Sequence, residues 1–410
     1  MESTPSHNFL KLLLFLSILH SFPPKSSATS TPLFPTGALP TKSGYLTVNS
    51  TTGSAIFYAF YEAQKPSSSL SQTPLLIWLQ GGPGCSSLIG NFYELGPWRV
   101  SSPKQNVEQL ALEPNSGSWN RLFGLLFLDN PIGTGFSIAA SDEEIPRDQY
   151  GVAKHLFTAI TSFVALDPSF KSRPIYFTGE SYAGKYVPAI GYYILKKNTQ
   201  LPASRQVNLA GVAIGNGLTD PLIQVATHAV NAYFSGLIND KQKSQMEELQ
   251  NEAVALTKKG NWSEATNAKK QSLEFAAKHD RTGHFGHCDL RDGVVSTEAW
   301  MKKMKWEGIE KFMEAERKVW NVNGELAGYV QKWGSLSHAV VLGAGHLVPT
   351  DQAVSSQAMI EDWVLESGIF TNENIHNLSK NFQGFDCLLT SFSFPLRLLP
   401  ISFRHLMFIK

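Results

Sequence analysis

The sequence contains few cysteines and almost no net charge, and each of these absences excludes a class of protein. Its 410 residues include only Cys85, Cys288 and Cys387, which are too widely spaced for a zinc site. An odd number of cysteines in a secreted chain leaves at least one thiol unpaired or intermolecular, and no pairing can be deduced. With 35 basic and 34 acidic residues and no basic run, the sequence gives no electrostatic reason to expect nucleic-acid binding.

Hydrophobic runs long enough to span a membrane are also missing. The apolar run at residues 12–19 follows Lys11 and is too short to span a bilayer, and the small residues Ser26, Ser27 and Ala28 come after it. This layout predicts a secretory signal peptide over residues 1–28, with no membrane association once it is removed. Three Asn-X-Ser/Thr sequons fit a secreted glycoprotein: Asn49, Asn261 and Asn377.

Short apolar runs alternate with helix-length segments over most of the chain, in which 42% of the residues are hydrophobic. The nearly continuous apolar runs predict strands buried on both faces, at residues 74–79, 125–128, 175–177 and 209–214. A further strand is expected over residues 333–342, and helices over residues 149–166, 186–197, 224–234 and 353–365. This alternation predicts an α/β fold with a mainly parallel sheet, whose ligand site lies beyond the carboxyl ends of the strands.

Two regions differ in character from this α/β pattern. Residues 238–280 are polar, rich in Lys and Glu, and poor in strand signal, which predicts surface helices or a lid-like insertion. Residues 371–410 are hydrophobic in part, interrupted by proline and without amphipathic period. We therefore expect one domain over residues 29–370 with a helical insertion, followed by a tail.

Ser181 is the candidate nucleophile. It lies in Gly-Glu-Ser-Tyr-Ala-Gly (179–184), between a strand-like run and a helix-like run, where hydrolases of the α/β type place a G-x-S-x-G turn. The fifth position is Ala183 rather than glycine, and a serine in an ordinary turn is the competing interpretation.

A serine hydroxyl needs a base and an acid that orients the base, and in this fold both follow it along the chain. His346 lies in a glycine-containing loop after a predicted strand and before a predicted helix, which suits the base. Asp289 is preferred as the acid over Asp292, although both lie between Ser181 and His346.

The turn Gln-Gly-Gly-Pro-Gly (80–84) follows another buried strand and favours close backbone approach. An N–H group from this turn and the N–H of Tyr182 would form an oxyanion hole. A phosphate-binding loop is the alternative, but no Lys-Ser/Thr pair ends the turn and no dinucleotide-binding spacing is present.

Four motifs in this order together resemble the serine carboxypeptidase family, and more closely its plant serine carboxypeptidase-like members: WLQGGPGCSS (78–87), LDNPIGTGFS (128–137), GESYAGKYVP (179–188) and GHLVP (345–349). The resemblance implies an α/β-hydrolase fold, no cofactor, an extracellular or vacuolar location, and removal of C-terminal residues from peptides, favoured at acidic pH.

The same resemblance implies roles for individual residues. Ser181 would be the nucleophile, His346 the general base and Asp289 its orienting acid, with the N–H groups of Gly82 and Tyr182 as the oxyanion hole. Four further residues would bind the C-terminal carboxylate of the substrate: Gln80, Glu180, Trp78 and Glu94. Glu180 must then be protonated, or share a proton, because two carboxylates in contact repel each other.

The chain departs from the family pattern in two places. Position 80 is usually Asn in the family and here is Gln80, which leaves room for a different ligand, as in relatives that transfer acyl groups from glucose esters. The polar residues 277–288 stand where an apolar strand should precede Asp289, so we infer a missing segment roughly between residues 265 and 286. That segment would include a sheet strand and the partner that the family gives Cys85. An inactive or purely binding isoform is the third hypothesis.

Overall fold

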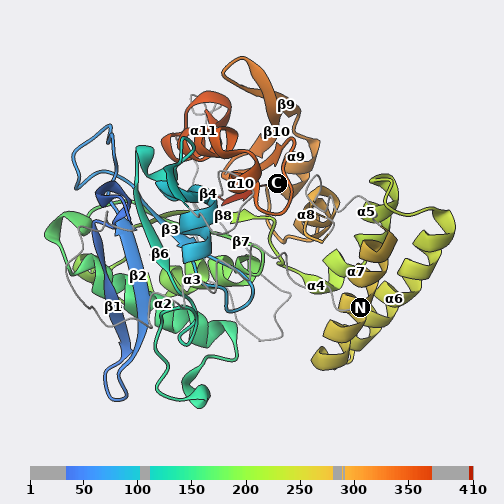
Figure 1. Cartoon of the computed structure of the whole chain (residues 1–410), viewed down its shortest axis with the longest axis horizontal. Coiled ribbons are helices and arrows are strands. Elements are labelled where there is room, and N and C mark those ends of the chain that lie inside the picture. The colour runs from blue at the N-terminus through green and yellow to red at the C-terminus, as the bar shows by residue number, and fades with distance from the viewer. Residues whose placement is uncertain (1–33, 102–110, 280–288, 290, 372–405, 410) are drawn as a thin grey trace.

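The computed structural model describes residues 34–101, 111–279, 289, 291–371 and 406–409. A mixed sheet of ten strands runs through this part of the chain, in the order β1-β2-β6-β3-β7-β8-β12-β11-β10-β9 (Figure 1). The first six of these in chain order are β1 (Lys42–Asn49), β2 (Ser54–Tyr61), β3 (Leu75–Leu79), β6 (Gly124–Leu128), β7 (Ile175–Glu180) and β8 (Leu209–Gly215). The others are β9 (Arg317–Val322), β10 (Glu325–Trp333), β11 (Leu336–Val341) and β12 (Leu406–Ile409).

Within the run β6-β3-β7-β8-β12-β11, each strand is parallel to the next. Outside this run all pairs are antiparallel: β1 with β2, β2 with β6, β11 with β10, and β10 with β9. The structure therefore confirms the α/β fold with a mainly parallel centre. A separate two-stranded sheet is formed by β4 (Trp98–Ser101) and β5 (Ala111–Pro114).

The apolar strands form two hydrophobic cores because successive side chains of a strand point to opposite faces of the sheet. Leu75 and Ile77 of β3 pack in the core that includes α2 (Gln149–Val164) and α3 (Ala183–Asn198). Leu76 and Trp78 pack in the core on the other face, with α11 (Ala353–Leu365). Helices thus cover both faces, which explains why β3, β6 and β7 are buried along their whole length.

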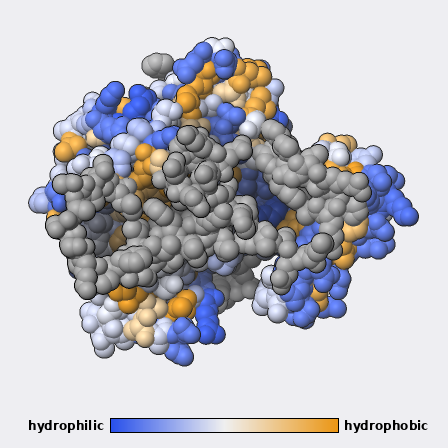
Figure 2. Space-filling view, in the orientation of Figure 1, coloured by the Kyte–Doolittle hydropathy of each residue, from blue (hydrophilic) through white to orange (hydrophobic). Residues whose placement is uncertain are grey.

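The polar insertion forms a helical hairpin made of α6 (Asp240–Lys258) and α7 (Trp262–His279), against which α5 (His228–Phe234) packs (Figure 1). Hydrophilic residues cover much of the outer rim of this hairpin (Figure 2). The expected surface helices are confirmed. The remaining short helices are α4 (Pro221–Val225), α8 (Val294–Met301), α9 (Ile309–Glu314) and α10 (Val348–Asp351).

Two predicted elements were wrong in extent. The expected helix over residues 224–234 is divided between α4 and α5, and at the break the hydroxyl of Thr227 donates to the carbonyl of Gln224 (2.8 Å), as threonine often does in competition with helical bonding. The expected strand over residues 333–342 is divided between β10 and β11 by a two-residue turn, in which Gly334 has φ of +55°.

The sheet position between β8 and β11 is occupied by β12, from the tail. Leu406–Ile409 pairs in parallel with Val212–Gly215 of β8 and with Leu336–Ala339 of β11. A missing sheet strand before Asp289, as the sequence predicts, therefore leaves no open position between β8 and β11. Asp289 itself is not part of a strand, and α8 begins after it at Val294.

Candidate active site

Ser181 lies in a tight turn between the end of β7 and the start of α3. Its φ of +62° is in the left-handed region that residues other than glycine rarely adopt. The turn is held by its backbone, since the Ser181 N–H donates to the carbonyl of Gly215 (3.0 Å) and the Ser181 carbonyl accepts from Leu218 N–H (2.8 Å). A strained backbone that the surrounding structure enforces is typical of functional positions.

Gly179 makes this turn possible. A Cβ atom there would collide with the carbonyl oxygen of Leu79 and would lie 2.7 Å from the Cβ of Ala183. The fully buried Ala183 at the fifth position of the motif is therefore accommodated because the first position is glycine. The alanine in place of the usual glycine leaves the geometry of a strand-turn-helix intact.

The turn after β3 lies directly against Ser181. A Cβ on Gly81 would collide with the backbone nitrogen of Tyr182 and would lie 2.8 Å from the Cβ of Ser181. Gly82 follows with φ of +111°, a conformation that glycine adopts without strain. The backbone of Gly81 and the Tyr182 N–H are thus neighbours of the serine, where an oxyanion hole would have to be, and Gly82 is the next residue of this turn.

His346 and Asp289 form a short hydrogen bond. The Nδ1 atom of His346 lies 2.7 Å from Oδ2 of Asp289, and the Asp289 side chain is buried while that of His346 is 23% exposed. The same Oδ2 accepts from Nδ2 of Asn216 (2.8 Å), and Oδ1 accepts from the backbone N–H groups of Arg291 (3.0 Å) and Asp292 (3.1 Å). These donors fix the carboxylate in one orientation.

The pKa values of this pair move apart, as expected for an acid that stays ionised beside a base. Burial raises the pKa of Asp289, but the charge of His346 and the hydrogen bonds from His346 and Asn216 outweigh it and hold the pKa well below its usual range. Burial lowers the pKa of His346, but the Asp289 carboxylate outweighs it, so the net pKa of the imidazole is raised. The pair can hold a positive charge on the imidazole.

Asp292 and Asn216 complete the surroundings of the pair. The Oδ1 atom of the buried Asp292 accepts from Nε2 of Gln224 (3.2 Å), and burial followed by the Asp289 charge raises the pKa of Asp292 to about 6. The structure thus distinguishes two aspartates that chain order could not separate. Asn216 was missed, although it stands in a Gly-Asn-Gly turn after the buried strand β8, at the same edge of the sheet.

The other ring nitrogen of His346 faces a residue that the sequence did not suggest. Nη2 of Arg291 lies 3.2 Å from Nε2 of His346. Because a guanidinium group only donates hydrogen bonds, Nε2 must be the acceptor, and the ring proton is then on Nδ1, facing Asp289. Within the described residues, Oγ of Ser181 makes no hydrogen bond to His346.

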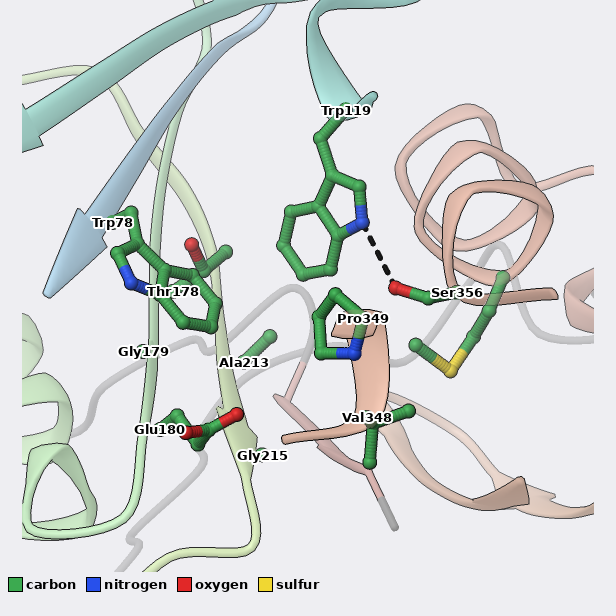
Figure 3. A pocket seen from close by; sticks show the side chains of 11 residues that line it. Trp78, Trp119, Thr178, Gly179, Glu180, Ala213, Gly215, Val348, Pro349 and Ser356 are labelled. Carbon is green, nitrogen blue, oxygen red and sulfur yellow. Dashed lines mark hydrogen bonds between the residues drawn. The ribbon is translucent and has the colours of Figure 1, made fainter. Parts of the chain in front are cut away.

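A group of buried polar side chains lies beside the nucleophile, on the side of β3. Nε1 of Trp78 donates to Oε1 of Gln80 (2.8 Å), and Nε2 of Gln80 donates to Oε1 of Glu180 (3.3 Å). Glu94 is also fully buried, at the end of the helical turn η2 (Gly90–Leu95). Glu180 and Trp78 line a small pocket together with Trp119 and Pro349 (Figure 3).

The two glutamates in this group favour their protonated forms. Burial raises the pKa of Glu94 to about 7, against smaller lowering contributions from Glu180 and Gln80. Burial, reinforced by the charge of Glu94, raises the pKa of Glu180 well above its usual range. The group can therefore hold at least one proton at mildly acidic pH, which is what a carboxylate ligand requires of it.

The side chains of Asp289, Asp292 and His346 place possible metal-ligand atoms within 4.8 Å of one another. Both ring nitrogens of His346 are engaged, however, and the guanidinium of Arg291 stands beside one of them. The geometry suits an acid–base pair better than a cation site. Cys85 is a free thiol, and Cys288 and Cys387 lie outside the described residues.

Comparison of the sequence with known families and proteins gives consistent matches. The family model described as serine carboxypeptidase matches residues 32–283 and 284–366. Serine carboxypeptidase-like 50 from Arabidopsis thaliana is 49% identical, over 84% of this chain and 92% of the relative. A probable serine carboxypeptidase, CPVL, from Dictyostelium discoideum is 30% identical, over 79% of this chain and 78% of the relative.

Comparison with solved structures supports the same fold. A prohormone-processing carboxypeptidase from Saccharomyces cerevisiae superimposes with a TM-score of 0.66 at 21% sequence identity, covering 81% of this chain and 92% of that one. Its identity is low enough that the likeness concerns the fold alone. In the part of the chain that the structure describes, no helix combines the length and the apolar character needed to cross a bilayer.

Proposed function

Because this chain belongs to the serine carboxypeptidase family, a family of hydrolases, we propose that it removes C-terminal residues from peptides by a serine mechanism. The observation that carries the proposal is the meeting of three segments at one edge of the sheet. These are the strained turn at Ser181, the Asp289–His346 hydrogen bond, and the buried group of Gln80 and Glu180.

In the proposed reaction, Oγ of Ser181 attacks the carbonyl carbon of the last peptide bond and gives its proton to Nε2 of His346. Asp289 stabilises the imidazolium that forms, and the N–H groups of Gly82 and Tyr182 donate to the oxyanion. The imidazolium then protonates the leaving amine as the C–N bond breaks. A water molecule, deprotonated by His346, then attacks the acyl-serine ester, and the imidazolium returns that proton to Oγ of Ser181 as the C–O bond breaks and the shortened peptide leaves.

The proposed recognition of the substrate's C-terminal carboxylate uses Gln80 and Glu180, supported by Trp78 and Glu94. Trp78 fixes the amide of Gln80 by bonding its oxygen, so that the amide nitrogen is directed toward Glu180. With its raised pKa, Glu180 is protonated at acidic pH and can donate to a carboxylate instead of repelling it. This predicts tighter substrate binding below pH 7, near the pKa of Glu94.

The test is mass spectrometry of a blocked dipeptide incubated with the protein between pH 4.5 and 8. Loss of the C-terminal residue, greatest at acidic pH and abolished in the Ser181→Ala variant, supports the proposal. Equal activity of the wild-type protein and the Ser181→Ala variant contradicts it.

Acyl transfer from a glucose ester is a second candidate, and Gln80 is the observation that favours it. The additional methylene of Gln80, relative to the Asn usual in the family, changes the reach of the amide that would bind the substrate's end. Incubation with a glucose ester and an alcohol acceptor distinguishes the two reactions. Transfer yields a new ester, whereas hydrolysis yields the free acid.

An inactive isoform is the third candidate, since the bond between Ser181 and His346 is not formed in this structure. Labelling with a fluorophosphonate probe tests it, because the probe reacts only with an activated serine. Folded protein that is not labelled, under conditions in which a serine carboxypeptidase control is labelled, would favour an inactive chain.

The hydrolase domain is proposed to extend over residues 29–370, with a shortened insertion at about 238–280.

Entry into the secretory pathway, for an extracellular or vacuolar location, is proposed from the signal peptide over residues 1–28, which precede the described part. Asn261 is an exposed residue just before α7 and is the sequon most open to glycosylation in the described part; Asn377 lies outside it. A mass decrease on glycosidase treatment, smaller in Asn261→Gln, would support this route.

A further inference from the structure

Arg291 lies beside the reacting nitrogen of His346 in the candidate site, and Asp289 helps to hold it there. Its backbone N–H donates to Oδ1 of Asp289 (3.0 Å), and its guanidinium reaches Nε2 of His346 (3.2 Å). Nε2 is the atom that must accept the proton of Ser181 and later protonate the leaving amine. Arg291 therefore contacts the nitrogen that the proposed reaction uses, and its donor competes with the serine hydroxyl for the same lone pair.

Among the described residues, the Arg291 guanidinium forms one side-chain hydrogen bond, to His346. Arg291 makes no ion pair with any carboxylate in the part of the chain that the structure describes. The two aspartates that flank it in the sequence accept other side-chain hydrogen bonds, Asp289 from His346 and Asn216, and Asp292 from Gln224. A second cation, Lys269 of α7, interacts electrostatically with Asp292, Asp289 and Arg291. An arginine beside a reaction centre with unused N–H groups is a ready receptor for a carboxylate.

The position of Nε2 indicates which carboxylate of the substrate Arg291 would bind. Since Nε2 protonates the leaving amine, the residue that departs must lie next to it, within reach of Arg291. In the proposed function the α-carboxylate of that residue is bound at Gln80 and Glu180, which leaves its side chain to face the guanidinium. An acidic side chain would form a charge-assisted, bidentate pair there.

We propose that Arg291 is a specificity-determining residue, which selects peptides ending in Asp or Glu and blocks the general base until such a residue arrives. The acidic side chain draws the guanidinium away from His346, and Nε2 then becomes available to Ser181. With a neutral C-terminal residue, Arg291 stays on Nε2 and the reaction is slow. This inference rests on the proposed carboxypeptidase function.

The experiment compares kcat/KM for blocked dipeptides that end in Glu or in Gln, which have nearly the same shape and differ in charge. We expect the wild-type protein to prefer Glu by about tenfold, as one charge-assisted hydrogen bond allows. In Arg291→Gln the Glu/Gln ratio should fall to near one, and kcat/KM for the Gln peptide should rise because the base is released. Arg291→Lys, which retains the charge but not the fork, should keep part of the preference.

Arg205→Gln, on the exposed turn η6 (Ala203–Arg205), is the matched control and should retain the wild-type ratio. A wild-type Glu/Gln ratio near one overturns the proposal without any variant. It is also overturned if Arg291→Gln loses activity on both peptides equally, which is the mark of a structural role. Failure of both the wild-type protein and Arg291→Gln, in which the base is released, to cleave either peptide or to react with a fluorophosphonate would instead contradict the carboxypeptidase function itself.

Discussion

His346 and Asp289 lie 57 residues apart in the sequence, and their side chains meet at 2.7 Å. The loop after β11 delivers the histidine, and the segment before α8 delivers the aspartate. Asn216, after β8, bonds the same carboxylate oxygen. The Asp289–His346 hydrogen bond therefore forms only when three separate segments are correctly assembled.

Replacing Asp289 by Asn should reduce kcat by about 10³–10⁴-fold. The Asn amide can present an N–H group to Nδ1, which then carries no proton and places the ring proton on Nε2, where the base is needed. The measurement is kcat for a blocked dipeptide, together with circular dichroism to verify folding. Asp292→Asn is the matched control and should change kcat by less than about tenfold, since Asp292 bonds Gln224 rather than the imidazole. Equal losses in the two variants would contradict the assignment of the acid.

Replacing Gln80 by Leu should raise KM for peptides with a free C-terminus by about tenfold, the effect of one hydrogen bond to a charged group. It should change KM little for the same peptides with an amidated C-terminus, because these offer no carboxylate. Gln72→Leu, on the exposed loop before β3, serves as a control for the loss of an amide. An equal rise of KM for free and amidated peptides would show that Gln80 acts through packing and not through the carboxylate.

The buried Glu94 should make folding stability fall as the pH rises. Its pKa is about 7 in the folded protein, above the usual 4.5, so the folded state binds its proton more tightly than the unfolded state does. The corresponding stability is present below pH 4.5 and is lost as the pH rises toward 7, by up to about 3 kcal/mol at 1.36 kcal/mol per pKa unit. Glu94→Gln lacks this proton equilibrium and should gain stability relative to the wild-type protein over that range.

The readout is the difference in unfolding free energy between Glu94→Gln and wild type, from urea titrations at pH 4.5, 6 and 7.5. The difference is needed because burial lowers the pKa of His228 to about 3 and of His338 to about 4. Those two histidines make stability rise with pH, and their contribution cancels when the two proteins are compared. A difference that stays constant with pH would contradict the raised pKa of Glu94.

The sequence could predict the parts of the site that local patterns encode. Apolar runs identified β3, β6, β7 and β8, because strands buried on both faces need such runs. The turn at Ser181 and the loop at His346 follow from glycines at the ends of these strands. The contact between Arg291 and His346 could not be predicted, since it depends on a side-chain direction and on a distance across the fold. The tail strand could not be predicted either, because its only signal is a short apolar segment.

The comparisons bear on the missing segment that the sequence predicts. The alignment with the Arabidopsis relative extends over 416 positions but covers 84% of this chain, about 344 residues, which leaves roughly 70 positions without a counterpart. The family model matches in two blocks that meet at residues 283 and 284. We infer that a segment is missing near that point, before Asp289, where an apolar strand was expected.

Removing β12 should therefore destabilise the protein and disturb the site. Neighbouring strands are about 4.8 Å apart, so without β12 the strands β8 and β11 would face each other across about 10 Å, too far for their backbone groups to bond. Asn216 follows β8 and His346 follows β11, and both side chains bond Asp289. Because β12 lies between β8 and β11, it sets the distance between Asn216 and His346. A chain that ends at residue 405 should melt about 5–10 °C lower than the full chain, the effect of losing a few kcal/mol, and should react more slowly with a fluorophosphonate.

A chain that ends at residue 409 retains β12 and is the matched control for this truncation. Phe408→Pro tests the same strand in the full-length chain, because proline removes a backbone donor from the middle of the strand. It should lower the melting temperature in the same direction. If both the truncated chain and Phe408→Pro melt and react like the full chain, β12 does not contribute to the sheet. The Asp289–His346 pair would then be held by Asn216 and by the two backbone N–H groups of Arg291 and Asp292 without help from the tail.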